Sequence, residues 1–331
     1  MRGQVRPDEH GDPVAAVLRA HRVGARLALA TSGTTATSGT TSAVTSPLRR
    51  VLRTTQSWWA TFPAYSDLTG VAAGARVWVP GPLRSTMNLF AAVHAAWVGA
   101  DLVRDAADAT HACLTPAQLV RRGPELPRGA RVVVAGDHLP WQVAAEARAV
   151  GLGIDRYYGA AELSFVAAAS DGGALRAFPG VEIEIRDAPV SGTIWVRSPW
   201  VCDGYDGPAG SLRRDAAGWA TVGDVGRVED GVLEVRGRPD AIITAGATVL
   251  VADVESVLTP AARGEVAVHA VPHPTLGQIV VATLTDGADR GRLELVSRER
   301  LPASHRPRVW RVVPELPLTA VGKLDRAALA R

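Results

Sequence analysis

Short apolar runs alternate with longer apolar or amphipathic segments over the first half of the chain. The short continuous apolar runs predict buried strands, and the longer segments predict helices. The predicted strands are Arg26–Ala30, Arg76–Val79, Leu102–Val103 and Arg131–Ala135. The predicted helices are Val14–His21, Thr86–Val98, a helix that Thr115 and Pro116 open, and Trp141–Val150. This alternation indicates an α/β fold with a mostly parallel sheet.

The pattern changes after about Asp171. Val181–Arg186 and Thr193–Arg197 alternate with a period of two, and Val225–Arg236 predicts a hairpin about Asp230-Gly231. We therefore expect a β-rich, antiparallel subdomain within the large N-terminal α/β domain.

A smaller α+β unit is expected from Pro239 onward. Its predicted elements are helices at Asp253–Leu258, Leu293–Glu299 and Leu324–Ala330, and strands at Val266–Val271 and Ile279–Leu284. The Gly237–Asp240 turn is the expected boundary, which gives an N-terminal domain of residues 1–238 and a C-terminal domain of residues 239–331.

Composition narrows the function classes. A net charge of +3 is too small to indicate nucleic-acid binding. The longest uncharged apolar run, Ser85–Ala100, is shorter than the ~20 residues of a membrane span. Cys113 and Cys202 lack metal-type spacing and suggest reduced thiols. The chain is expected to be soluble and cytoplasmic, with no membrane or nucleic-acid partner.

Lys323 is the single lysine among 36 Lys and Arg residues. An ammonium is a compact point charge, which a planar guanidinium cannot replace where one oxygen must be met closely. Pro317, Thr319 and Gly322 predict a loop that presents this lysine.

Three other segments carry candidate chemistry. A Ser/Thr/Gly loop follows the strand at Arg26–Ala30 and contains a duplicated hexapeptide, Ala30–Thr35 and Ala36–Thr41; such loops can cradle phosphate with backbone N–H groups. The segment Tyr157–Ser164 places a Glu beyond a glycine turn, where a carboxylate can hold Mg²⁺ with substrate phosphates. Gly218–Asp224 ends in an Asp that can accept ribose hydroxyls.

Together these pieces resemble the adenylate-forming superfamily of AMP-forming acyl-CoA ligases, over roughly residues 26 to 331. The resemblance rests on Thr31–Thr35 or Thr37–Thr41, Tyr158–Glu162, Val222–Asp224, Gly237–Asp240 and Leu316–Lys323. It implies ATP-dependent activation of a small-molecule carboxylic acid to an acyl-adenylate, then transfer to a thiol. That thiol belongs to CoA or to the phosphopantetheine of an acyl carrier protein.

The resemblance also implies roles for individual residues. Lys323 and Glu162 are the implied catalytic residues, Glu162 as the Mg²⁺ ligand, and Asp240 is the implied hinge of a mobile C-terminal domain. The implied nucleotide-binding residues are Thr31, Ser32, Gly33, Thr34, Thr35, Gly136, Tyr158, Gly159, Ala160, Asp224 and Arg238.

The chain departs from the family pattern at several positions. Neither hexapeptide copy is followed by the usual Gly and Pro-Lys, so Arg49 or Arg50 is a candidate for the loop cation, and which copy binds phosphate stays open. Ala161 replaces a Thr, and only about 30 residues precede the loop, which predicts a shortened N-terminal domain. A catalytically impaired nucleotide-binding relative is therefore an alternative.

Overall fold

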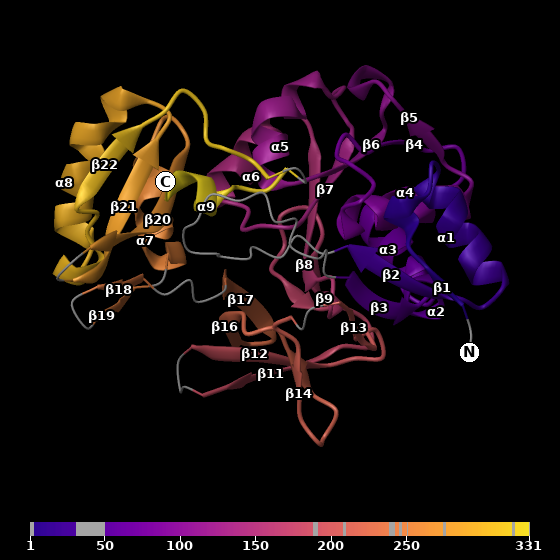
Figure 1. The fold of residues 1–331 in the computed structure, drawn as a ribbon. Helices are drawn as coiled ribbons and strands as arrows, with labels where there is room; N and C mark the ends of the chain where they lie inside the picture. The colour runs from indigo at the N-terminus through magenta and orange to yellow at the C-terminus, as the bar shows by residue number, and fades with distance from the viewer. Residues whose placement is uncertain are drawn as a thin grey trace. The chain divides into compact units, whose positions relative to one another are not determined.

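The computed structural model describes residues 3–30, 50–187, 191–207, 210–237, 242–244, 247–249, 251–273, 276–319 and 322–330. The chain divides into two compact units, Met1–Val235 and Arg236–Arg331, which are drawn in Figure 1. The division lies close to the turn that the sequence suggests as a boundary. Each unit is described by itself.

A seven-stranded sheet with the order β10-β9-β8-β7-β6-β4-β5 organises the described part of the first unit. Its strands are β4 (Arg76–Trp78), β5 (Asp101–Val103), β6 (His111–Leu114), β7 (Arg131–Val134), β8 (Gly153–Ala160), β9 (Ser164–Ala169) and β10 (Arg176–Ala177). The strands from β4 to β8 pair in parallel, whereas β9 pairs antiparallel with β8 and β10. The expected α/β class with a mostly parallel sheet is confirmed.

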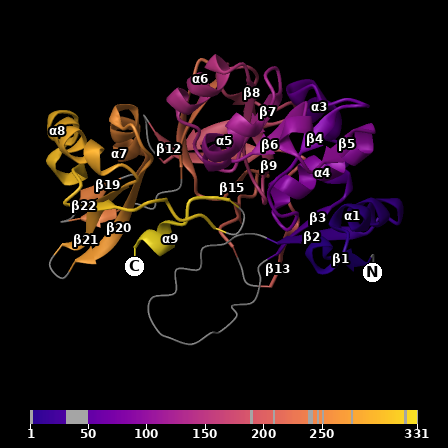
Figure 2. The ribbon, with the colours of Figure 1, turned by 90° about the horizontal axis from the view of Figure 1, so that it is seen from above.

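Helices cover both faces of this sheet (Figure 2). On one face, α3 (Phe62–Thr69) and α4 (Thr86–Val98) share a core with Val133 of β7. On the other face, α5 (Pro116–Arg122) and α6 (Trp141–Ala149) share a core with Val132 and Val134. Successive side chains of a strand point to opposite faces, so a continuous apolar run such as β7 supplies both cores.

A four-stranded sheet with the order β1-β2-β3-β13 lies in the same unit. Its strands are β1 (Gln4–Val5), β2 (Arg26–Ala30), β3 (Arg50–Thr54) and β13 (Gly204–Asp206), and the helices beside it are α1 (Pro13–Arg22) and α2 (Gln56–Trp59). The helix α1 begins where the Asp12 side chain accepts a hydrogen bond from the Ala15 amide at 3.0 Å.

The β-rich part is a six-stranded sheet with the order β14-β15-β12-β16-β17, in which β11 also pairs with β12. Its strands are β11 (Glu182–Arg186), β12 (Gly192–Arg197), β14 (Arg213–Arg214), β15 (Ala220–Thr221), β16 (Val225–Glu229) and β17 (Val232–Gly237). Asp230 and Gly231 join β16 to β17 with φ angles of 51° and 73°, as a two-residue hairpin turn of this hand requires.

The second unit is a five-stranded sheet covered by helices. Its elements are β18 (Ile242–Thr244), β19 (Ala247–Val249), β20 (Val266–His273), β21 (Gly277–Leu284), β22 (Val309–Val312), α7 (Val251–Leu258), α8 (Arg290–Arg300) and α9 (Arg326–Leu329). The strand order is β19-β18-β21-β20, with β22 parallel to β21. Leu258, Val268 and Leu293 lie in its core, and the expected α+β class is confirmed.

An aromatic cluster fills the space between α3, α4 and the start of β9. Phe165 of β9 lies at its centre and is 3% exposed. Its ring centroid is 4.9 Å from Phe90, 4.5 Å from Tyr157 and 4.8 Å from Phe178. This residue therefore ties the parallel sheet to the helices on one face.

We predict that Phe165→Ala lowers the free energy of unfolding by about 3–5 kcal/mol, because the substitution leaves a cavity among rings that cannot collapse into it. Urea denaturation followed by tryptophan fluorescence measures the change. Leu295→Ala, at a position 56% exposed, is the control and is expected to change stability by less than about 0.5 kcal/mol. Equal effects of the two substitutions would contradict the assignment.

His94 of α4 is a structural histidine. It is buried, its Nε2 lies 2.8 Å from Ser66 Oγ, and its ring contacts Phe62 and Tyr65 edge to face. Burial lowers the pKa of His94 from 6.5 to about 4.

A pH dependence of stability follows from this histidine. Its pKa is lower in the folded than in the unfolded chain, so the unfolded chain binds the proton first and stability falls as pH drops from about 6.5 towards 4. NMR titration of the His94 ring and urea denaturation across this range measure both quantities. His94→Gln, which cannot titrate, is expected to show a shallower loss. A ring that titrates near 6.5 would overturn the prediction.

Candidate active site

The carboxyl ends of parallel strands place the first site residues at one sheet edge. β7 pairs in parallel with β8, with Val134 opposite Arg156, so Gly136 after β7 and Tyr158 in β8 reach the same edge. Gly136 has a φ of 93°, which ends the strand and turns the chain. Crevices at such edges are the usual ligand sites of open α/β sheets.

Tyr158 and Asp224 meet at this edge. The Tyr158 hydroxyl donates a hydrogen bond of 2.8 Å to Asp224 Oδ2. Asp224 precedes β16 and is 9% exposed. Its backbone carbonyl accepts a hydrogen bond of 2.8 Å from the Ile194 amide of β12. The structure therefore brings together two residues that the sequence places 66 positions apart.

Glu162 lies in the tight turn between β8 and β9. The Leu163 amide donates to the Ala160 carbonyl at 3.1 Å, and Ser164 begins β9 with a φ of 63°, a strained value for a residue other than glycine. The Tyr205 hydroxyl donates to Glu162 Oε1 at 3.0 Å. Glu162 is 7% exposed, so a nearly buried carboxylate is held at the sheet edge.

Gly159 lies inside strand β8 and not in a turn, which corrects the expectation from sequence. The register between β8 and β9 shifts at Tyr158 and Gly159, as in a β-bulge. A Cβ atom at this position would lie 2.1 Å from the carbonyl oxygen of Ser164. Only glycine fits, because the facing backbone occupies that space; the turn that carries Glu162 begins after Ala160.

Two residues beside Glu162 were not recognised from the sequence: Arg53 of β3 and Tyr205 of β13. Burial, followed by the negative charge of Glu162, raises the pKa of Tyr205 to about 12, so its hydroxyl stays protonated and donates at neutral pH. Burial lowers the pKa of the Arg53 guanidinium, and Cys202 and Glu162 oppose that shift. Burial also raises the pKa of Cys202 and raises that of Cys113 to about 12; neither forms a disulfide.

The Ser/Thr/Gly loop, with Thr31, Ser32, Gly33, Thr34 and Thr35, lies outside the described residues. Arg238 of the proposed ribose contact and the proposed hinge Asp240 lie outside them as well. These assignments therefore stay predictions.

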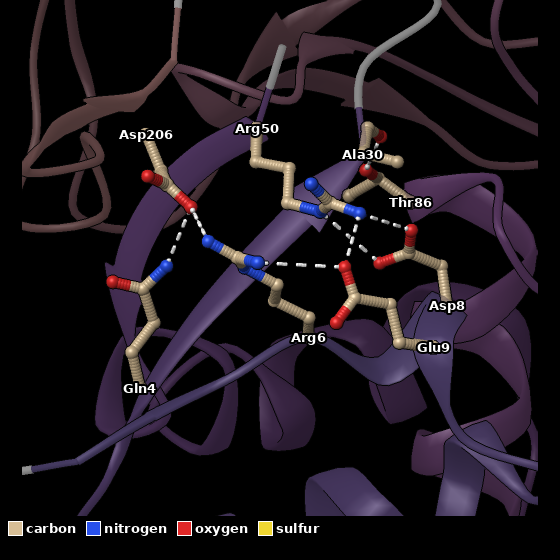
Figure 3. A network of polar contacts seen from close by, with 8 residues as sticks. All are labelled: Gln4, Arg6, Asp8, Glu9, Ala30, Arg50, Thr86 and Asp206. Atoms are coloured by element: carbon tan, nitrogen blue, oxygen red, sulfur yellow. Dashed lines mark hydrogen bonds and ion pairs between the residues drawn. The ribbon is translucent and has the colours of Figure 1, made fainter. Parts of the chain in front are cut away.

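The two chain ends that border the loop are described, and a polar network fixes them (Figure 3). The Thr86 hydroxyl donates to the carbonyl of Ala30 at 3.3 Å. Arg50 pairs through Nη2 with Asp8 and Glu9, both at 2.9 Å, and only 12% of its side chain is exposed. Because these carboxylates already occupy the Arg50 guanidinium, Arg49 is the better candidate for the loop cation.

Lys323 lies in the second unit, in a short loop before α9. The Thr319 amide donates to the Lys323 carbonyl at 2.6 Å, and the Lys323 amide donates to Thr319 Oγ1 at 3.2 Å. Gly322 has a φ of 80°, and Leu318 and Leu324 pair in an isolated antiparallel β-bridge. These contacts close the loop expected from the sequence around the single lysine.

Comparisons with known proteins decide the family. Residues 253–323 match the AMP-binding enzyme C-terminal domain. A probable 2-succinylbenzoate–CoA ligase of Mycobacterium tuberculosis (strain ATCC 25618 / H37Rv) is 30% identical over an alignment of 296 positions, and the match covers 83% of this chain and 74% of that relative. The chain belongs to the adenylate-forming family of acyl-CoA ligases. The resemblance inferred from the motifs is thereby confirmed.

Two further proteins that are similar to this chain are named for other reactions. The amide bond synthetase McbA from Marinactinospora thermotolerans has a TM-score of 0.69 and 30% identity; the match covers 86% of this chain and 68% of that one. A salicyl-AMP ligase / salicyl-S-ArCP synthetase of Mycobacterium tuberculosis (strain ATCC 25618 / H37Rv) is 34% identical over 42% of this chain and 26% of its own length.

Among the described residues, no helix is both long and apolar enough to cross a membrane. No three His, Cys, Asp or Glu side chains are grouped there so that they could hold a metal ion by themselves.

We predict that Gly159→Ala lowers the free energy of unfolding by about 1–3 kcal/mol, because the new methyl group forces β8 and β9 apart at the bulge. Gly11→Ala is the matched control, since a Cβ there meets nothing within 4 Å. Urea denaturation of both variants gives the comparison. A Gly159→Ala protein as stable as the control would show that the strands separate without cost.

Proposed function

We propose that this chain activates a carboxylic acid with ATP to an acyl-adenylate and pyrophosphate, and then transfers the acyl group to the thiol of CoA. The observation that carries the proposal is the hydrogen bond between Tyr158 and Asp224, in the same unit as the β8–β9 turn that holds Glu162. The ligase relative that is 30% identical over most of its length supports CoA as the acceptor.

The nucleotide roles follow the family motifs. The Tyr158 ring is proposed to lie beside adenine, with Gly136, Gly159 and Ala160 lining that part of the site. Asp224, and Arg238 outside the described residues, are proposed to bind ribose. Thr31, Ser32, Gly33, Thr34 and Thr35 are proposed to donate to the ATP phosphates. A nearly buried Asp224 that accepts from Tyr158 is suited to this, because a carboxylate accepts two hydroxyl hydrogen bonds.

Mg²⁺ fits the donor set around Glu162. Mg²⁺ commonly takes one or two protein carboxylates and completes its shell with substrate phosphates and water. Glu162 offers one such carboxylate, and the hydrogen bond from Tyr205 to its Oε1 orients it. When bound, the ion supplies neutralisation of the phosphate charge.

Lys323 is proposed to supply the second positive charge, between the attacking carboxylate and the α-phosphate. Because the protein mostly positions and neutralises in such a transfer, one well-placed cation accounts for a large part of the rate. A swing of the C-terminal domain about Asp240 is proposed to withdraw Lys323 before thiol attack.

The acceptor has one rival. The salicyl-AMP ligase relative, whose name includes an aryl carrier protein synthetase activity, favours transfer to carrier-protein phosphopantetheine as the second candidate. A panel of acids in a pyrophosphate-release assay identifies the acid. Mass spectrometry with CoA, a holo-carrier protein and a primary amine then identifies the acceptor. Pyrophosphate release with no acid of the panel would refute the proposed activity.

We predict that Lys323→Ala lowers acid-dependent ATP–pyrophosphate exchange by about 100-fold or more and leaves ATP binding nearly unchanged, because the lysine acts on the transferring group. Lys323→Arg is expected to lose most of the exchange too, since the planar guanidinium does not meet the same oxygens. Arg298→Ala on exposed α8 removes a charge from the same unit and serves as the control. Unchanged exchange in Lys323→Ala would remove the assigned role.

A further inference from the structure

The turn that carries Glu162 is held from outside its own sheet. The carbonyl of Ala161 accepts a hydrogen bond from Arg53 Nη2 of β3. The carbonyl of Glu162 accepts from the Cys202 amide at 2.8 Å, and its side chain accepts from Tyr205 of β13. The four-stranded sheet, directly and through the segment before β13, therefore fixes both the backbone and the carboxylate of the turn.

Arg53 contacts the β8–β9 turn and also the segment before β13. Nη1 lies 3.4 Å from the Trp200 carbonyl and 3.3 Å from Ser57 Oγ. β3 pairs with β13, with Leu52 opposite Gly204, so the guanidinium spans from its own strand pair to the β8–β9 turn. One rigid, planar group thus sets the spacing between the two segments that hold Glu162.

The charge of Arg53 is unusual for its surroundings. The residue is 1% exposed, and it makes no ion pair with a carboxylate of the described residues. Its Nε has no hydrogen-bond partner among them. Burial lowers the pKa of Arg53, and the negative charges of the carboxylates Glu162 and Asp203 oppose that shift. Removing a guanidinium from water without a carboxylate partner is unfavourable, and an apolar side chain at the same place would avoid that penalty.

We propose that Arg53 is a positioning residue for Glu162: it holds the Ala161–Glu162 backbone by its carbonyl and places a fixed positive charge beside the carboxylate that binds the divalent metal of the ATP complex. This inference rests on the proposed metal-binding role of Glu162. It goes beyond that role, because a residue on another sheet then determines metal affinity. Removing a hydrogen-bond partner of a metal ligand typically lowers metal affinity or activity by about 10–100-fold.

The test measures metal binding without turnover. Mn²⁺ binding to the full chain in the presence of ATP, followed by electron paramagnetic resonance, is compared for wild type, Arg53→Met and Arg53→Lys. We expect Arg53→Met to weaken Mn²⁺ binding by about 10-fold or more, with ATP binding in EDTA unchanged. Arg53→Lys restores the charge but not the planar fork, so it is expected to recover part of the affinity.

An ion pair in the same unit provides the control for a merely structural role. Arg131 forms an ion pair of 2.8 Å with Asp155, which is 1% exposed, and neither residue is among the proposed site residues. Arg131→Met is expected to lower the unfolding temperature while Mn²⁺ affinity stays at the wild-type value. At a comparable loss of stability, Arg53→Met must weaken Mn²⁺ binding more than Arg131→Met does.

The outcomes separate this inference from the proposed function. If Arg53→Met binds Mn²⁺ as tightly as wild type does, or if Glu162→Gln has no effect on Mn²⁺ binding, the positioning role is wrong even when acyl-adenylate forms. If Mn²⁺ binding depends on Arg53 while no acid yields pyrophosphate, the positioning role stands and the proposed ligase activity falls. Should Arg53→Met not fold, Arg53→Gln, which keeps an amide donor and removes the charge, is measured with the same expected and opposing results.

Discussion

A buried carboxylate on a short turn needs polar partners that the turn cannot provide for itself. Glu162 meets this constraint through the four-stranded sheet, which contributes the Tyr205 hydroxyl and, through Arg53, a donor for the neighbouring carbonyl. Without those donors, a carboxylate and a backbone carbonyl that are removed from water would lose their hydrogen-bond partners, which is unfavourable. The local geometry at Ser164, with its positive φ, persists because these surrounding contacts fix it.

Three sheets of one unit contribute separate parts of the site. The seven-stranded sheet supplies Tyr158 and the Glu162 turn, the six-stranded sheet supplies Asp224, and the four-stranded sheet supplies the supporting donors. Lys323, the cation proposed for the reacting group, belongs to the other unit. In an adenylate-forming ligase, the separation of these residues into two units suits a reaction whose two steps, adenylate formation and transfer to a thiol, require different surroundings.

The sequence predicts the elements whose apolar pattern is uninterrupted, such as the strand at Arg131–Ala135, observed at Arg131–Val134, and the helix at Thr86–Val98. It misses β3 and β8, because Arg53, Asp155 and Arg156 interrupt their apolar patterns. Motifs identify Tyr158, Glu162 and Asp224, but the hydrogen bond between Tyr158 and Asp224 depends on the packing of two sheets. The one available signal for Arg53 is that it shares a strand face with Val51, which is buried.

The burial of both native thiols has a practical consequence. Cys113 and Cys202 have less than 2% of their surface exposed, and burial raises their pKa values, so little reactive thiolate reaches the solvent. Cysteines introduced on the surface of each unit will therefore take up spin labels or fluorophores with little background from the native chain. Distances between such labels can then follow the C-terminal unit relative to the rest of the molecule as nucleotide and acid are added.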